Sequence, residues 1–254
     1  MTNLLRIERL RKTFGALAAV DDVDLALAQG ELTAVIGPNG AGKTTLINVL
    51  TGAIPPDTGR VLFREEEITR LPVHSRVRRG LTRSFQVMNI FPRLTVRENV
   101  LLPILARRGK ALSPFAALTD EGEVMDEADR LLDEVGLGPE AHREAGTLAH
   151  GNQRRLELAI AIASRPVLCF LDEPSSGMTP PERGMVLELI RRLAAERGTT
   201  FVIVEHDMDV VFSLAQRIVV MNRGRILADG PPDAIRANPH VREIYLGDEA
   251  GRTA

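Results

Sequence analysis

The feature that most constrains this chain is a run of small residues followed by a lysine and a threonine. It fits the spacing G-x-x-x-x-G-K-[ST] and reads Gly37-Pro38-Asn39-Gly40-Ala41-Gly42-Lys43-Thr44. Small residues let the backbone curl so that successive N–H groups point at phosphate oxygens, and a following helix adds its positive end. Lys43 can then reach terminal phosphates, and the Thr44 hydroxyl can bind Mg²⁺. The run therefore predicts a phosphate-binding turn.

The flanking sequence supplies the structure that such a turn requires. The apolar run Leu32–Ile36 predicts a short buried strand, and Lys43–Leu50 predicts a helix that stops at Gly52. The alternative is a glycine-rich turn that binds nothing. From average glycine usage, a chance match in a chain of this length is on the order of one in a hundred, so we favour the phosphate site.

Further strands and helices indicate an α/β core interrupted by a helical segment. Strands are expected where Val23, Leu25 and Leu27 alternate with polar residues, and at Val61–Phe63, Val167–Leu171, Phe201–Val204 and Ile218–Met221. Helices are expected at Thr95–Arg107, Glu121–Val135, Asn152–Ala163 and Glu182–Glu196. Strand signals become rare between residues 87 and 146, and residues 108–118 are expected to form a loop. This alternation predicts a parallel sheet covered by helices.

Composition sets the class of protein. With 254 residues, 44% hydrophobic and 26% charged, the chain is long enough for one large domain or two small ones and is neither disordered nor fibrous. A net charge of −2 gives no electrostatic case for binding nucleic acid. The single cysteine, Cys169, fits a reducing cytoplasm. Neither a signal peptide nor an apolar run of the ~20 residues of a membrane span is present, so another chain would supply any span.

Two carboxylates follow a second apolar strand. Asp172 is placed to hold a metal ion through water, and Glu173 to act as general base toward an attacking water. An apolar strand that ends in Asp-Glu is common and does not by itself indicate a catalytic site. In a chain that also has a phosphate-binding turn, we favour the catalytic interpretation. His206, after another apolar strand, would alone be read as a residue at a helix start, and Gln86 would alone indicate nothing.

Taken together, these residues resemble the nucleotide-binding subunit of an ATP-binding-cassette (ABC) transporter, and the resemblance covers nearly the whole chain. It implies that Gly37 to Thr44, with Thr45, form the Walker A loop that binds ATP. It further implies that Phe14 stacks on adenine and that Gln86 contacts the metal. Asp172 would be the Walker B aspartate for Mg²⁺, and Glu173 the catalytic base. His206 would contact the γ-phosphate.

The resemblance also implies the architecture. We expect one ABC ATPase domain over residues 1–254, with a P-loop NTPase α/β core built on a mainly parallel sheet. An N-terminal antiparallel β subdomain and an inserted α-helical subdomain, at about residues 87–165, are expected to complete it.

The chain departs from the family in its signature motif. The usual L-S-G-G-Q reads Leu148-Ala149-His150-Gly151-Asn152, so Ala149 replaces the serine that reaches the partner's γ-phosphate. Gly151 is retained, and the helix that follows it keeps its anion-facing start. The alternative is that His150 or Asn152 supplies a substitute donor. In the loop after Walker B, Thr179 stands where many relatives have Asp.

Finer features resemble the branched-chain amino-acid uptake systems, whose relatives carry amides, urea or aromatic acids. They are Arg83–Gln86, Asn89–Val100, Val204–Met208 and Val241–Gly247. The resemblance implies a peripheral protein on the cytoplasmic face of the membrane that binds membrane-spanning permease subunits. Such importers pair two different ATPase subunits, and this chain resembles the longer one. We expect a head-to-tail heterodimer, with a homodimer as the alternative, an indirect link to a solute-binding protein and no nucleic acid.

The sequence argues against several other functions. A soluble ABC ATPase of translation would carry two cassettes, and one of DNA repair would carry a heptad coiled coil; the sequence has neither. A GTPase would show the motif Asn-Lys-x-Asp, which is absent from the sequence. A silent regulatory ATPase is disfavoured because Glu173 and His206 are both present. The ATPase of an exporter stays open, since no single residue separates it from an importer.

Overall fold

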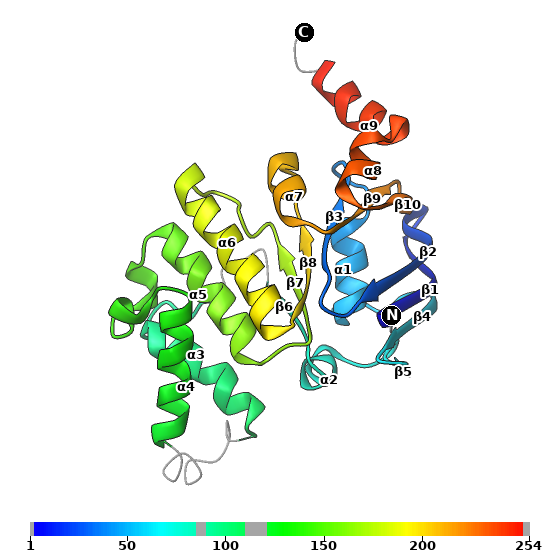
Figure 1. Ribbon diagram of the computed structural model, residues 1–254. Coiled ribbons are helices and arrows are strands. Elements are labelled where there is room, and N and C mark those ends of the chain that lie inside the picture. Colours follow the sequence, from blue (N-terminus) through cyan, green and yellow to red (C-terminus); the bar gives the residue numbers. More distant parts are fainter. Residues whose placement is uncertain (1–2, 85–89, 110–120, 251–254) are drawn as a thin grey trace. The chain divides into compact units, whose positions relative to one another are not determined.

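The computed structural model describes residues 3–84, 90–109 and 121–250, and Figure 1 shows its helices and strands. The chain divides into two compact units. Unit 1 comprises residues 1–76 and 194–254, and unit 2 comprises residues 77–193. No helix formed by the described residues combines the length and the apolar character needed to cross a bilayer.

The described strands are β1 (Asn3–Phe14), β2 (Leu17–Ala28), β3 (Leu32–Ile36), β4 (Thr58–Phe63), β5 (Glu66–Glu67), β6 (Leu81–Ser84), β7 (Leu168–Asp172), β8 (Thr200–Val204), β9 (Arg217–Asn222) and β10 (Arg225–Gly230). The described helices are α1 (Lys43–Thr51), α2 (Val73–Arg78), α3 (Val96–Arg107), α4 (Glu121–Glu134), α5 (His150–Ala163), α6 (Pro180–Arg197), α7 (Met208–Leu214), α8 (Pro232–Ala237) and α9 (Pro239–Ala250). Two short 3₁₀ turns, η1 (Gly138–Glu140) and η2 (Ala145–Thr147), lie between α4 and α5.

The antiparallel sheet of unit 1 has the strand order β2-β1-β4-β5. The predicted alternation in β2 is confirmed: Val23, Leu25 and Leu27 are buried, and Asp24 between them is exposed. A strand with this period buries one face and leaves the other to solvent, which an antiparallel sheet allows. The expected N-terminal β subdomain is therefore present.

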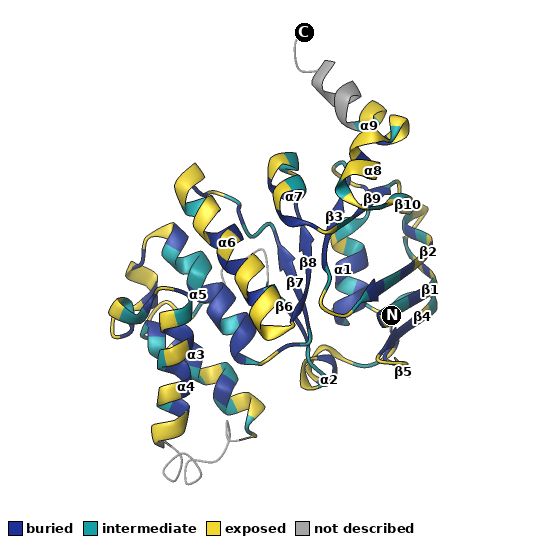
Figure 2. Ribbon diagram, in the orientation of Figure 1, coloured by how far each residue is buried: buried dark blue, intermediate teal, exposed yellow. Residues whose placement is uncertain are grey.

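A second, mainly parallel set of strands in unit 1 positions the phosphate loop. β3 pairs in parallel with β8 on one side and with β9 on the other, and β10 runs antiparallel to β9. Every residue of β3 and β8 is buried, as shown in Figure 2. Continuous apolar strands of this kind are typical of parallel sheets covered on both faces. The predicted strands Leu32–Ile36 and Phe201–Val204 are confirmed.

Unit 2 contains a parallel pair of strands, β6 and β7, and the helices α3, α4 and α5, which pack against one another. The predicted apolar face of α4 is confirmed, because all of its members are buried: Val124, Ala128, Leu131, Leu132 and, just beyond the helix, Val135. Helix α3 begins with a capping box, in which Thr95 Oγ1 accepts a bond from the Glu98 N–H (3.2 Å) and the Glu98 carboxylate accepts one from the Thr95 N–H (2.7 Å).

Unit 2 also contains a charged cluster that the pattern of apolar residues in the sequence does not predict. The buried carboxylate of Glu127 in α4 pairs with Arg107 (2.7 Å), Arg108 (3.1 Å) and Arg165 (2.8 Å). Burial alone would raise the pKa of Glu127, but the hydrogen bond of Arg108 and the charges of Arg107 and Arg165 outweigh it and hold the pKa below its ordinary value. The cluster ties α4 to the ends of α3 and α5.

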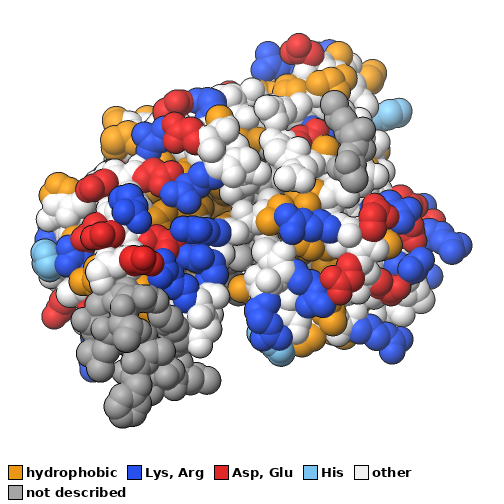
Figure 3. Space-filling view, turned by 60° about the horizontal axis from the view of Figure 1, so that its bottom comes forward, with side chains coloured by type: hydrophobic (Ala, Val, Ile, Leu, Met, Phe, Trp, Pro, Cys, Tyr) orange, Lys and Arg blue, Asp and Glu red, His pale blue; other side chains and the backbone are white. Residues whose placement is uncertain are grey.

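These elements confirm the predicted fold class, a P-loop α/β core with an antiparallel β sheet and inserted helices. The expected loop at residues 108–118 lies almost entirely outside the described residues. The assignment of residues 87–165 to one inserted subdomain stays a prediction, although α3, α4 and α5 all lie in that range. On the face shown in Figure 3, basic and acidic side chains are interspersed, in keeping with the net charge of −2.

Candidate nucleotide site

The predicted phosphate loop lies in unit 1 and connects β3 to α1. Gly42, the residue before α1, has a φ of 101°, and a Cβ there would overlap the carbonyl oxygen of Ala19 in β2, so only glycine fits. The Ala41 N–H donates to the Pro38 carbonyl (3.1 Å), and the Ala41 carbonyl accepts from the Gly224 N–H (2.9 Å). The loop is thus fastened to β2 and to the turn between β9 and β10.

The mouth of this loop suits an anion. Asn39, Gly40 and Thr44 are exposed, and Thr45 is half-buried. The Lys43 ammonium donates to the carbonyls of Gly37 (2.6 Å) and Pro38 (3.1 Å), so it lies folded over the loop. All residues of α1 are described, and its first turn carries no acidic side chain that would offset the positive helix end.

Two other predicted residues lie in the same unit. Phe14, the last residue of β1, is 52% exposed, and the Lys12 ammonium lies 5.7 Å from the centre of its ring. An exposed ring can stack on a base. His206 is exposed and follows β8. It does not cap the next helix, because Asp207 is the residue whose side chain accepts from the N–H groups of Asp209 (3.0 Å) and Val210 (3.3 Å).

The two predicted carboxylates lie at the end of β7 in unit 2. Asp172 is buried and forms an ion pair with Arg83 of β6, whose Nε lies 3.1 Å from Asp172 Oδ2. Glu173 has a φ of 45°, which is unusual for a residue other than glycine. Such a backbone costs on the order of 1–3 kcal/mol, and six other residues besides glycines adopt a positive φ in the described part of the chain. The chain therefore leaves β7 through a sharp turn directly at the predicted base.

The signature residues begin α5, also in unit 2. Ala149 is the exposed N-cap of α5, and no side chain caps this helix start. Gly151 is buried against Glu182, whose carboxylate accepts bonds from the N–H (3.0 Å) and hydroxyl (2.7 Å) of Thr179. These two bonds hold the pKa of Glu182 below its ordinary value. Thr179 therefore helps to shape the start of α6.

The two proposed substitutes for the missing serine have partners within the chain. His150 Nε2 lies 3.4 Å from the carbonyl oxygen of Ser176, and Asn152 Oδ1 accepts a bond from Arg155. The contact with Arg155 directs the Asn152 oxygen toward α5 itself. The alternative in which one of them replaces the serine would need these contacts to change.

The predicted glutamine, Gln86, lies outside the described residues. Of the remaining predicted metal ligands, Thr44 offers a hydroxyl and Asp172 a carboxylate. No group of three or more His, Cys, Asp or Glu side chains in the described part of the chain could hold a metal ion by itself. Each of these oxygen donors is of a type that fits Mg²⁺, which keeps several waters and binds through one or two protein oxygens together with substrate phosphates.

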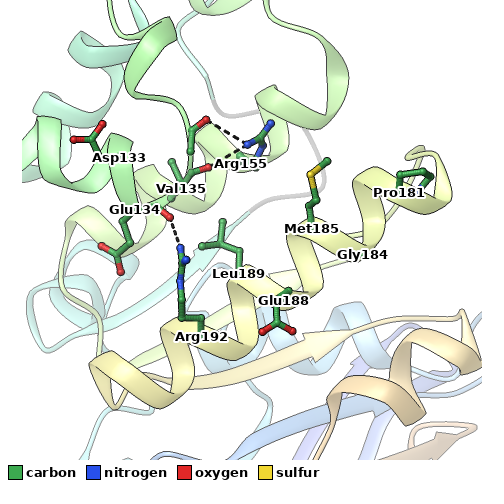
Figure 4. A pocket seen from close by; sticks show the side chains of 11 residues that line it. Asp133, Glu134, Val135, Arg155, Pro181, Gly184, Met185, Glu188, Leu189 and Arg192 are labelled. Atoms are coloured by element: carbon green, nitrogen blue, oxygen red, sulfur yellow. Dashed lines mark hydrogen bonds between the residues drawn. The ribbon is translucent and has the colours of Figure 1, made fainter.

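Unit 2 also has a hollow of about 590 Å³ between the end of α4, α5 and α6 (Figure 4). At its edge, Arg155 donates to the carbonyls of Val135 (3.4 Å) and Gly136 (3.3 Å), and Arg192 donates to that of Glu134. The two arginines thus satisfy carbonyl groups at the carboxyl end of α4, where a cation is favourable. None of the predicted site residues lines this hollow.

Comparison with known proteins agrees with the geometry. Residues 20–176 match the family model described as ABC transporter, and residues 225–251 match the model described as branched-chain amino acid ATP-binding cassette transporter. The high-affinity branched-chain amino acid transport ATP-binding protein BraF of Pseudomonas aeruginosa is 41% identical over 252 residues, which are 96% of this chain and 98% of that protein.

Solved structures show the same fold. The ADP conformation of the ABC transporter cassette MJ1267 is 33% identical, with a TM-score of 0.84 over 97% of this chain and 100% of that chain. A dimeric, post-hydrolysis form of the cassette MJ0796 bound to ADP and phosphate is 26% identical, with a TM-score of 0.76 over 90% of this chain and 98% of that chain. The chain belongs to the ABC transporter family, as one of its ATP-binding subunits.

Proposed function

We propose that this ABC ATPase energises the import of branched-chain amino acids or of related small solutes such as amides, urea or aromatic acids. The observation that carries the proposal is the match of the C-terminal segment, residues 225–251, to the branched-chain model, in a chain that resembles BraF over nearly its full length. An exporter ATPase would share the nucleotide-binding loop without requiring that segment.

In this proposal the residues of unit 1 bind the nucleotide. Phe14 stacks on adenine, and the backbone N–H groups of the loop from Gly37 to Gly42 surround the phosphates. Lys43 exchanges its two carbonyl partners for phosphate oxygens, which form stronger, charge-assisted bonds. Thr44 and Thr45 close the loop, and His206 contacts the γ-phosphate.

Hydrolysis depends mainly on residues of unit 2, and Thr44 comes from unit 1. Glu173 accepts the proton of the attacking water, since a carboxylate within reach of that water is the general base. Thr44, Asp172 and Gln86 would hold Mg²⁺, which neutralises phosphate charge when bound. Gly151 and the N-terminal end of α5 face the γ-phosphate on a partner subunit, to which Ala149 contributes no hydroxyl.

The chain would work at the cytoplasmic face of the membrane, bound to permease subunits. The exposed side chain of Phe91, 57% accessible, supports this docking, whereas the neighbouring Val96 is fully buried and belongs to the core of unit 2. We propose a head-to-tail heterodimer with a second ABC ATPase, which carries the serine that this chain lacks. A solute-binding protein would act on the permease subunits and not on this chain.

The test is transport by the assembled complex. The chain is purified with its membrane subunits, placed in vesicles with ATP on the side of the ATPase, and supplied with binding protein and labelled leucine, acetamide or urea on the other side. The proposal predicts ATP-dependent accumulation of one of these solutes, and no accumulation with the Glu173→Gln variant. In a parallel assay the labelled solute starts on the ATPase side, and its ATP-dependent movement away from that side would instead identify an exporter.

A further inference from the structure

We infer that Arg83 is the positioning residue of Asp172: it balances the charge of this buried carboxylate and fixes which of its oxygens faces the metal. The inference rests on the proposed function, in which Asp172 holds Mg²⁺ through water. Arg83 and Asp172 both belong to unit 2, and the inference uses no residue of the phosphate loop in unit 1.

The first observation is the geometry of the pair. β6 and β7 are parallel neighbours, with Arg83 opposite Phe170 and Ser84 opposite Leu171. This register lets the Arg83 side chain reach along the sheet to the last residue of β7. Its Nε (3.1 Å) and its Nη2 both donate to Oδ2 of Asp172. Because both bonds end on one oxygen, the ion pair leaves Oδ1 to a second partner.

The second observation is burial. The Asp172 side chain is 3% exposed and that of Arg83 is 7% exposed. A carboxylate that is withdrawn from water is strongly destabilised unless a counter-charge and hydrogen bonds replace its hydration. Arg83 provides both a counter-charge and two hydrogen bonds. Groups behind a ligand commonly tune metal affinity in this way, by orienting the ligand.

Arginine also suits this role better than lysine. A guanidinium presents several N–H donors in a rigid plane, so two of them can grip one oxygen and fix the carboxylate plane. An ammonium would supply charge without this fixed direction. A glutamine would supply neither the charge nor the fork.

The experiment measures binding of a fluorescent ADP analogue to the purified chain, in EDTA and across a Mg²⁺ titration, so that no turnover is needed. The variants are Arg83→Gln, Arg83→Lys, Asp172→Asn and the double variant Arg83→Gln/Asp172→Asn. Arg107→Gln serves as the matched control, because it weakens another buried ion pair of unit 2, with Glu127. Thermal unfolding of each variant reports its folding.

We expect Arg83→Gln to raise the Mg²⁺ concentration for half-maximal effect about tenfold to a hundredfold, with ADP affinity in EDTA unchanged. Arg83→Lys should recover part of the loss, Arg107→Gln should behave as the wild type, and Arg83→Gln should add nothing on the Asp172→Asn background. If Arg83→Gln unfolds, the charge-retaining Arg83→Lys still reports, through a Mg²⁺ response weaker than that of the wild type.

Two results overturn the inference, and a third overturns its foundation. A wild-type Mg²⁺ response of Arg83→Gln, or an equal loss of ADP affinity with and without Mg²⁺, would make the pair only a structural link between β6 and β7. A wild-type Mg²⁺ response of Asp172→Asn would instead refute the proposed metal role of Asp172.

Discussion

At the scale of single residues, Ala149 combines two roles in one position. It is the N-cap of α5, and the helix start has no side-chain cap. In the proposed function it also occupies the signature position, from which a serine would reach the γ-phosphate of the partner subunit. A hydroxyl at this position would therefore act in two ways, as a cap for the helix and as a donor to the nucleotide.

We predict that Ala149→Ser raises the ATPase rate of the homodimer at saturating Mg-ATP. A charge-assisted bond is worth about 1.5–3 kcal/mol, or roughly tenfold to a hundredfold if it acts fully in the transition state. Capping should also raise the free energy of unfolding, by about 0.5–2 kcal/mol. Steady-state ATPase and urea denaturation measure the two effects separately.

Ala149→Asp is the matched control for this prediction. Aspartate caps a helix as well as serine does, but its charge repels phosphate. It should stabilise the fold and lower the rate. A Ser variant that still binds ATP and dimerises, but hydrolyses no faster than the wild type, would count against the missing-donor explanation.

The sequence predicts the phosphate loop and both carboxylates because their neighbours in the chain define them. It could not locate the partner of Asp172, because Arg83 lies 89 positions away and meets it only through strand pairing. In the sequence alone, Arg83 is only one of the residues that resemble the branched-chain subfamily. A buried arginine-carboxylate pair between two strands has no signature at fixed spacing.

At the scale of elements, the helix that follows the phosphate loop is held from its far end. Arg76 of α2 is 1% exposed, and it donates to the carbonyls of Val49 (2.8 Å) and Leu50 (2.7 Å) at the carboxyl end of α1. It also donates to the carbonyls of Thr69 (2.9 Å) and Leu71 (2.9 Å). Burial lowers the pKa of Arg76 to about 10, so the side chain is still charged near neutral pH.

We predict that Arg76→Met lowers the free energy of unfolding by about 3 kcal/mol or more, because it removes the hydrogen bonds that Arg76 donates to four backbone carbonyl groups. Urea denaturation measures the change. The exposed Arg70 gives a control, and Arg70→Met should shift the free energy by no more than about 0.5 kcal/mol. Equal stability of the two variants would show that Arg76 does not secure α1.

Side-chain hydrogen bonds from helix α3 fix the loop that carries Phe91. The side chain of Asn99, buried in α3, accepts a bond from the Phe91 N–H (2.7 Å) and donates to the carbonyls of Phe91 (3.1 Å) and Thr95 (2.9 Å). With a fourth, longer bond to the Leu94 carbonyl (3.4 Å), these contacts hold the loop, and Phe91 is exposed to solvent.

We predict that Asn99→Leu reduces ATP-driven transport by the assembled complex, while the isolated chain keeps its ATPase activity. The apolar side chain fills the space but removes the side-chain bonds to the loop, each worth about 0.5–1.5 kcal/mol. Phe91→Ala, which keeps the loop and removes the contact, should give the same uncoupling. Full transport by both variants would move the permease contact elsewhere.

The sequence predicts correctly the elements with a long helical period of apolar residues, such as α4, or with a continuous apolar run, such as β3. The short helices α7, α8 and α2 were not predicted, since six or seven residues span fewer than two turns and show no reliable period. The N-terminal strand β1 carries several charged residues, which interrupt the alternation of apolar and polar side chains. The sequence therefore does not show where this strand begins and ends. It became a strand through pairing with β2 and β4.

At the scale of the whole molecule, the proposed roles divide between the two units. The residues proposed to bind ATP, from Phe14 to Thr45, belong to unit 1, and the proposed base, Glu173, belongs to unit 2. Binding and hydrolysis should therefore be separable by substitution. The central claim, an ATPase in which Glu173 is the general base, predicts that a change at Glu173 stops hydrolysis and spares binding.

Single-turnover hydrolysis by the Glu173→Gln variant tests this claim most directly. The amide keeps the shape of the carboxylate but cannot accept a proton, so the rate should fall by about 10²–10⁴, with ATP affinity near that of the wild type. The exposed Glu188 gives the control, and Glu188→Gln should hydrolyse ATP normally. A Glu173→Gln variant that binds ATP and hydrolyses it at a near-normal rate would contradict the account.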